Sequence, residues 1–359
     1  MDSVSYYVHA VTPMAHVSDD FLRDVLRTYE ASGSNAEATA RAMGKPGTTV
    51  KNWLKIAQRR NVTLNKPQFE VAPIPSEHLS REELIAFRKK QFQAKRAHQE
   101  AKRLRDVRVR LIGPIGIVHF GDPHVDDDGT DIGLLEDHMQ IVKKTEGLFG
   151  ANLGDLSNNW IGRLARLWAQ QGTSSAQAWQ LVEWMCHYID WLYLVGGNHD
   201  AWSGTGDPLK WIMGQAQTAF DYSGVRINLK FPNGKAVRIN ARHDFSGNSM
   251  WNPAHGPMKA VQGGWRDHML TCGHKHTSFV GGPLKDPATG LLSWSIRCAG
   301  YKVFDRYVEE NGFPDQNAFP ACVTIIDPRF ADDDTRLITV IPDVAEGADF
   351  LKWKRRKAA

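Results

Sequence analysis

The chain has 359 residues, a hydrophobic content of 42% and twelve tryptophans, enough for a sizeable core and about two domains. No run of about eighteen apolar residues occurs, and the N-terminus lacks a basic region followed by an apolar run, so we expect neither a membrane span nor a signal peptide. Without CxxC spacing, the cysteines are expected to be buried thiols in a reducing, cytoplasmic setting; they are Cys186, Cys272, Cys298 and Cys322.

The net charge of +4 is unevenly distributed along the chain. Residues 1–110 hold 20 Lys/Arg against 12 Asp/Glu, and the remainder holds 24 against 28. A basic front half joined to a slightly acidic rear half indicates that the front half handles a polyanion. The acidity of the rear half is also what a cation-binding site would produce.

The front half is predicted to be helical. Apolar residues at helical spacing and capping residues predict helices over 18–31, 35–43 and 48–60, which form a first domain over residues 1–65. Residues 66–110 are expected to contain a proline-bearing linker, 66–78, and a long basic helix over 80–107. A charge run is usually a solvated face, so this helix indicates nucleic-acid contact only weakly.

The segment 36–55 fits a helix-turn-helix template. Ala40 stands where the two helices must approach closely, Gly44 is at the turn, and Val50 and Trp53 lie on the packing face, although Lys45 stands where an aliphatic residue is usual. On this template the DNA-facing residues, in the major groove or near phosphates, are Thr48, Thr49, Lys51, Asn52, Lys55, Arg59 and Arg60. The alternative is a small helical bundle that contacts another protein.

Residues 111–345 alternate short apolar runs with helical patterns, which predicts an α/β domain that begins with parallel strands. Helices are expected over 131–145 and 173–190. Asn233-Gly234 predicts a hairpin turn, and later strands are expected over 268–272, 291–298, 321–326 and 335–341. Residues 346–359 are expected to form a short basic tail.

Polar motifs follow five of the predicted strands. Residues i and i+2 of an extended segment point the same way, so the Asp-x-His and His-x-His motifs each present two ligands to one side. Carboxylate, imidazole and amide oxygen together suit borderline first-row metals. His243 is preferred over the nearby His255 because it ends a predicted strand. The candidate metal ligands are Asp122, His124, Asp155, Asn198, His243, His274 and His276.

This order of motifs, D-x-H, GD, GNHD, H and GHxH, resembles that of the calcineurin-like metallophosphoesterase family over roughly residues 115–330. The resemblance implies a two-sheet sandwich flanked by helices and two divalent ions, with manganese favoured over Fe, Zn, Co or Ni. It implies that Asp122, His124 and His276 hold one ion, that Asn198, His243 and His274 hold the other, and that Asp155 bridges them. It also makes His199 the catalytic histidine.

The expected chemistry follows from two such ions. They can clamp a phosphate and lower the pKa of a bridging water, whose hydroxide attacks phosphorus in line. His199 would stabilise the phosphoryl oxygen or protonate the leaving alkoxide, and Asp200 is expected to orient an imidazole. Asn158 stands where family phosphoprotein phosphatases carry the aspartate that polarises the catalytic histidine, and their phosphate-binding arginine is absent from its usual place.

These departures argue against a protein phosphatase. The helix-turn-helix and basic connector, joined to a two-metal site, favour a nuclease that resembles the exonuclease branch of the family, including its phage-encoded homologues. The partner is then expected to be DNA. The alternatives are a small-molecule phosphodiesterase or phosphomonoesterase with a protein-docking module, and a DNA-binding regulator with a scaffold phosphoesterase domain. Candidates for substrate contact are Asn158, Asn159, Trp160, Arg163 and Arg166.

Overall fold

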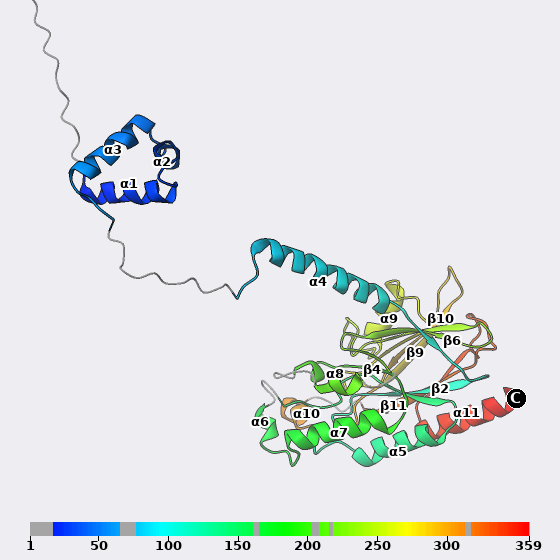
Figure 1. Cartoon of the computed structure of the whole chain (residues 1–359). Coiled ribbons are helices and arrows are strands. Elements are labelled where there is room, and N and C mark those ends of the chain that lie inside the picture. The colour runs from blue at the N-terminus through cyan, green and yellow to red at the C-terminus, as the bar shows by residue number, and fades with distance from the viewer. Residues whose placement is uncertain are drawn as a thin grey trace, which may run out of the picture. The chain divides into compact units, whose positions relative to one another are not determined.

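The computed structural model describes residues 17–64, 77–160, 165–202, 208–214, 218–312 and 317–358. The chain forms two compact units, residues 1–84 and residues 85–359 (Figure 1). Among the described residues, no helix is both long enough and apolar enough to cross a membrane.

The first unit contains α1 (Asp19–Ala31), α2 (Ala36–Met43) and α3 (Gly47–Arg59), which match the three predicted helices to within one residue at each end. The side chains of Ser18 and Asn35 accept backbone N–H groups at the starts of α1 and α2. Gly44 ends α2 in the left-handed conformation, at φ 58°. This allows the chain to turn sharply into α3.

A small core holds the three helices together. Val25, Ala40 and Val50 are buried at its centre, and Phe21 and Trp53 pack against it. The rings of Phe21 and Trp53 meet edge to face with their centroids 4.8 Å apart. The packing predicted for Ala40, Val50 and Trp53 is therefore confirmed.

The long basic helix is shorter than predicted. α4 (Arg81–Lys102) has no buried residue, and instead of continuing to 107 the chain forms β1 (Arg105–Arg108). β1 pairs in parallel with β6 (Val225–Lys230), and Asp106 accepts hydrogen bonds from Asn228 (3.0 Å) and Lys230 (2.7 Å) across that pair. Long-range strand pairing thus replaces the helical pattern at this point.

The second unit contains two six-stranded sheets. The first has the order β1-β6-β7-β8-β10-β9 and adds to β1 and β6 the strands β7 (Ala236–Ala241), β8 (Met269–Cys272), β9 (Phe279–Lys285) and β10 (Leu292–Arg297). The second has the order β12-β11-β2-β3-β4-β5. Its strands are β2 (Ile115–Phe120), β3 (Leu148–Asn152), β4 (Trp191–Val195), β5 (Ala219–Asp221), β11 (Ala321–Ile326) and β12 (Ile338–Ile341).

β2, β3, β4 and β5 pair in parallel, as predicted for the start of the α/β domain, while β11 is antiparallel to β2. The predicted hairpin is formed by β6 and β7, with Gly234 in its turn at φ 86°. Apolar side chains fill the space between the sheets, including Ile117 and Leu153 from one and Ile227 and Ile239 from the other. The two-sheet sandwich expected from the sequence is confirmed.

Helices cover the outer face of the second sheet, where Val118 and Phe120 pack with residues of α5, α7, α8 and α11 (Figure 1). The first sheet carries α9 on its outer face, through Phe245, Leu270 and Val261. The helices of this unit after α4 are α5 (Ile132–Lys144), α6 (Ala165–Trp168), α7 (Ser175–Tyr188), the 3₁₀-helix η2 (Asp200–Trp202), α8 (Pro208–Met213), α9 (His255–Gln262), α10 (Arg306–Asn311) and α11 (Val344–Ala358).

The segment expected as a basic tail is part of α11. Val344, Ala348 and Leu351 are buried at helical spacing, and the Lys354 ammonium lies 3.3 Å from the buried Asp327 carboxylate. An apolar stripe and one buried cation therefore attach this helix to the sandwich. The four cysteines are free and buried, as predicted.

Candidate metal centre

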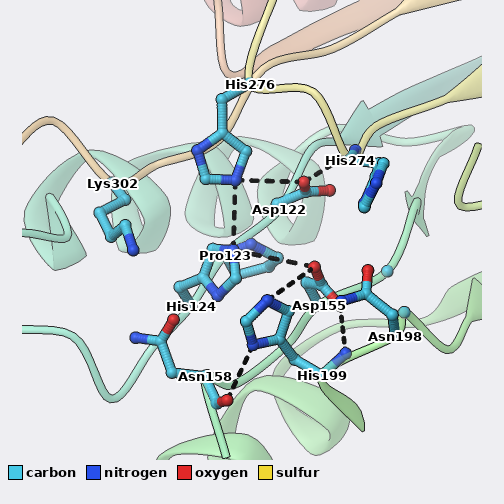
Figure 2. A network of polar contacts seen from close by, with 12 residues as sticks. Asp122, Pro123, His124, Asp155, Asn158, Asn198, His199, His274, His276 and Lys302 are labelled. Atoms are coloured by element: carbon cyan, nitrogen blue, oxygen red, sulfur yellow. Dashed lines mark hydrogen bonds and ion pairs between the residues drawn. The ribbon is translucent and has the colours of Figure 1, made fainter. Parts of the chain in front are cut away.

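The predicted ligands follow strands of both sheets. Asp122 and His124 follow β2, Asp155 follows β3, and Asn198 follows β4 in the second sheet. The remaining ligands follow β7 and β8 in the first sheet; they are His243, His274 and His276. These strand ends converge, and Figure 2 shows the side chains gathered around Asp122 and Asp155.

The backbone is strained at four of these ligands. His124, Asp155, His274 and His276 have φ values of 42°, 49°, 70° and 48°, in the left-handed region that residues with a Cβ rarely adopt. Each such conformation costs about 1–3 kcal/mol and persists only where the surroundings impose it. Strain concentrated on the ligands is typical of a functional site.

Asp122, His124 and His276 form the first cluster. The Nε2 atom of His276 lies 3.3 Å from Asp122 Oδ2 and 3.2 Å from His124 Nε2. Asp122 and His124 are almost fully buried, and among the described residues Asp122 Oδ1 and His124 Nδ1 have no hydrogen-bond partner. Burial and, secondarily, the charge of Lys302 hold the pKa of His124 well below its usual value, so its imidazole is neutral and able to bind a metal.

Asp155, His243 and His274 form the second cluster, with Asn198 beside them. His243 Nε2 lies 3.1 Å from Asp155 Oδ2, 3.0 Å from Asn198 Oδ1 and 3.0 Å from His274 Nδ1. On its other side, His243 Nδ1 is 2.9 Å from the carbonyl oxygen of Leu153, which fits a donated N–H. That hydrogen bond directs Nε2 into the cluster.

Asp155 lies between the two clusters. Its Oδ2 atom is 3.1 Å from His243 Nε2 and 4.0 Å from His124 Nε2, so one oxygen faces both groups. Its Oδ1 atom accepts the backbone N–H of His199 at 3.0 Å, which fixes the carboxylate (Figure 2).

The residues fit metal ions. A neutral His243 that donates its Nδ1–H to Leu153 directs the lone pair of Nε2 at Asp155 Oδ2, Asn198 Oδ1 and His274 Nδ1. These electron-rich atoms repel one another unless a cation lies among them. Burial opposes a charged imidazolium, but Asp155 and Asp122 outweigh it and raise the pKa of His243 to about 10. The cluster therefore attracts positive charge, and its imidazole, carboxylate and amide donors suit divalent first-row metals.

Glycines leave room for the carboxylates. A Cβ atom on Gly197 would overlap Asp155 Oδ1, and one on Gly273 would overlap Asp122 Oδ1. The glycines that flank the motifs are thus required by the close approach of the carboxylates to the backbone.

His199 lies at the edge of the centre. Its Nε2 atom is 3.8 Å from Asp155 Oδ2, and its Nδ1 atom is 2.8 Å from the main-chain carbonyl oxygen of Asn158 (Figure 2). The group that orients His199 is therefore a backbone carbonyl, at the position where the family resemblance of the sequence led us to compare an aspartate side chain.

Asp200 has a different role from the expected one. Its buried carboxylate accepts backbone N–H groups from Gly197 (2.8 Å), Leu156 (3.0 Å) and Ser157 (3.4 Å), whereas the sequence suggested that it orients an imidazole. Burial and the neighbouring Asp155 raise its pKa to about 7. Asp200 thus fastens the loop after β4, which carries Asn198, to the loop after β3, which carries Asp155.

Two of the residues predicted to contact substrate form hydrogen bonds within the protein. Asn158 is 1% exposed, and its Nδ2 donates to Asp127 Oδ2 at 2.8 Å, so its side chain does not face substrate as predicted. The Nδ2 of half-buried Asn159 donates to the main-chain oxygen of His199 at 3.1 Å.

Substrate contact by the two candidate arginines stays a prediction. Arg163 lies outside the described residues. Arg166 forms an ion pair with Glu310 at 2.7 Å.

One cation beside the centre, Lys302, belongs to no sequence motif. The Lys302 ammonium is nearly buried, 3.2 Å from Asp127 Oδ2 and 3.1 Å from Asp305 Oδ2, and Figure 2 shows it near the first cluster. Asp305 Oδ2 is in turn 3.8 Å from His276 Nδ1. Lys302 and Thr130 form an isolated backbone bridge, a long-range contact that no local pattern signals.

The predicted DNA-facing residues lie on or just after α3, but two of them already bind other groups of the protein. The ammonium of Lys51 binds Glu37 at 2.7 Å, and Arg60 donates to the Val17 carbonyl at 2.6 Å. Thr49 is half-buried, and the exposed remainder is Thr48, Asn52, Lys55 and Arg59.

Comparison with known proteins gives little beyond this geometry. No protein-family model matches the chain, and no curated protein matches it. Among solved structures, the crystal structure of a single mutant of Vps29 from Entamoeba histolytica is similar, with 9% sequence identity and a TM-score of 0.31. The match covers 63% of this chain and 97% of that one.

Proposed function

We propose that the chain is a metal-dependent phosphoester hydrolase. The observation that carries the proposal is the pair of ligand clusters with the Asp155 carboxylate between them, 4.0 Å from His124 Nε2, and with the His199 imidazole 3.8 Å from that carboxylate. Two adjoining cation sites with a positioned imidazole suit a reaction in which negative charge develops on phosphoryl and leaving oxygens.

Asp122, His124 and His276 would hold one ion, and Asn198, His243 and His274 the other, with Asp155 between them. When bound, two divalent ions supply a clamp for the phosphate and a water of lowered pKa as nucleophile. Manganese is the metal we propose.

His199 would act on the phosphate or on the leaving group. Because its Nδ1–H donates to the Asn158 carbonyl, its Nε2 faces the centre. A protonated Nε2 can donate to a phosphoryl oxygen and then release its proton to a departing alkoxide. Asp200 and Asn159 would act by holding the surrounding loops in place, through hydrogen bonds to their backbone.

DNA is the substrate we favour, which makes the chain a nuclease. The support is a basic front half and a three-helix unit whose third helix exposes Asn52, Lys55 and Arg59. Cations on one helix face can bind phosphates and bring a polyanion to the centre.

A small-molecule phosphoesterase with a protein-docking module is the second candidate. The exposed helix α4 favours it, because Leu84, Ile85, Phe87 and Phe92 are each 48–64% exposed. Apolar side chains in such number on one exposed helix are typical of a protein contact.

The test is a metal-supplemented assay of bis-p-nitrophenyl phosphate, p-nitrophenyl phosphate, and linear and circular DNA in parallel. We expect Mn²⁺-dependent hydrolysis of the diester and of DNA, abolished by chelator. Hydrolysis of the small esters but not of DNA would favour the docking module. No hydrolysis of any phosphoester by metal-loaded protein would refute the proposal.

A further inference from the structure

A second polar hollow lies outside the metal centre. It has a volume of about 220 Å³ and is lined mainly by Lys102, Arg103, Arg226, Asn240, Arg242 and Trp265. Arg226 and Asn240 alternate along β6 and β7 with Ile227 and Ile239, which face the core between the sheets. The hollow therefore opens on the outer face of the first sheet.

The hollow carries excess positive charge. Lys102 is paired with Asp221, and Arg226 with Asp267. Within the described part of the chain, Arg103 and Arg242 have no ion pair, although Arg242 Nε is 3.3 Å from Asn240 Oδ1. Two of the four cations are thus left without a counter-charge, which favours an anionic occupant.

Asn240 is the second sign of a ligand. Its side chain is 1% exposed, yet among the described residues its Nδ2 has no hydrogen-bond partner. A buried amide donor without a partner is unfavourable, because it has lost its hydrogen bonds to water and gained none in the protein. An oxyanion in this hollow would supply the missing acceptor.

Trp265 holds the two arginines in place. The Cζ atoms of Arg226 and Arg242 lie 5.0 Å and 5.1 Å from its ring centroid. Guanidinium groups ordered on an aromatic ring lose less freedom when they bind a further anion, because their geometry is already set.

We propose that this hollow is a binding site for a phosphate group. Ligand pockets for drug-sized molecules span about 300–1,000 Å³, so a hollow of about 220 Å³ suits one tetrahedral oxyanion better than a whole nucleotide. Guanidinium forks match phosphate geometry by paired hydrogen bonds. The phosphate comes either from solution or from a polynucleotide backbone, and the site stands independently of the proposed hydrolysis.

Calorimetric titration of the metal-loaded full chain with inorganic phosphate tests the site. The wild type is expected to bind one more equivalent than Arg242→Gln, or to bind it at least about tenfold more tightly, since a charge-assisted hydrogen bond is removed. Arg238→Gln is the matched control, because Arg238 lies on β7, which Arg242 directly follows, and contacts Asp267 as Arg226 does, but does not line the hollow. It should bind phosphate as the wild type does.

If Arg242→Gln fails to fold, Arg103→Gln still tests the site, because Arg103 is exposed and its replacement leaves the core untouched. It should also weaken the extra phosphate equivalent. Displacement of phosphate by a short single-stranded oligonucleotide would identify a polynucleotide as the source, and its failure would identify free phosphate; both results support the site. Equal phosphate binding by the wild type, Arg242→Gln and Arg103→Gln would overturn it.

Discussion

Replacing His199 by alanine is expected to lower diester turnover by about 10²–10⁴, the usual contribution of a positioned acid or base. At 1.36 kcal/mol per factor of ten, this loss is about 3–5 kcal/mol of transition-state stabilisation. The structure supports an effect of this size because the ring is fixed by the Asn158 carbonyl at 2.8 Å and its Nε2 is 3.8 Å from Asp155.

The same replacement should leave the metal content intact. The contact that holds Asp155 Oδ1 comes from the backbone N–H of residue 199, which alanine retains. Metal analysis of the purified variant, followed by rates on diesters with good and poor leaving groups, separates the role of the backbone N–H in holding Asp155 from the role of the imidazole in catalysis. The rate loss should be smaller with p-nitrophenolate, because that anion needs little protonation. His187→Ala, which changes an exposed histidine on α7, is the matched control.

Two outcomes would refute this reasoning. Loss of bound metal from His199→Ala would mean that the imidazole is a ligand and not an acid. Equal rate losses for good and poor leaving groups would replace acid catalysis by electrostatic stabilisation of the phosphoryl oxygen.

The remaining predictions concern the metals, the loops and the front unit. Asp155→Asn should lose both ions and Asp122→Asn chiefly one, so two tightly bound ions in Asp155→Asn by metal analysis would disprove the shared carboxylate. Because the pKa of His243 is raised to about 10, metal must displace its proton, so Mn²⁺ affinity should rise from about pH 6 to about pH 8 with measurable proton release; a flat profile would contradict this. Asn158→Ala should lower the free energy of unfolding by about 1–3 kcal/mol in a denaturant titration but keep turnover, because only its main chain contacts His199; a large loss of turnover at unchanged stability would contradict it. Lys55→Ala should reduce the log–log salt slope of DNA binding by about 0.9 and spare small-diester turnover, and an unchanged slope would argue against DNA contact by α3.

The positions of the candidate metal ligands at strand ends could be predicted because each signal is local. A polar motif directly after an apolar run identifies a strand end. The expectation that His274 and His276 present two ligands to one side of an extended segment is wrong, because both residues have left-handed φ values and they lie in different clusters. Asp122 with His124 and His274 with His276 each span two residues of one such loop. The sequence did not signal the left-handed backbone at these positions, which closes each loop around the centre.

Other elements depend on contacts between distant parts of the chain. The four residues of β1 contain three charges and little apolar pattern, and only the parallel pairing with β6 makes them a strand. In α11, the basic run from Lys352 to Lys357 obscures the stripe of Val344, Ala348 and Leu351. Lys302 belongs to no motif and reaches the centre through its backbone bridge to Thr130.

The orientation of His199 shows why residue identity alone misleads at such a site. The sequence has Asn158 where family phosphoprotein phosphatases carry the aspartate that polarises the catalytic histidine, and this departure argued against a protein phosphatase. The structure supplies the acceptor from the main chain, and it uses the Asn158 side chain to bind Asp127, which also binds Lys302. Any residue at this position presents a carbonyl, so the imidazole is oriented by the path of the loop. Asp200 fixes that path through three backbone N–H groups, so the geometry of the loop, rather than side-chain identity, orients the imidazole.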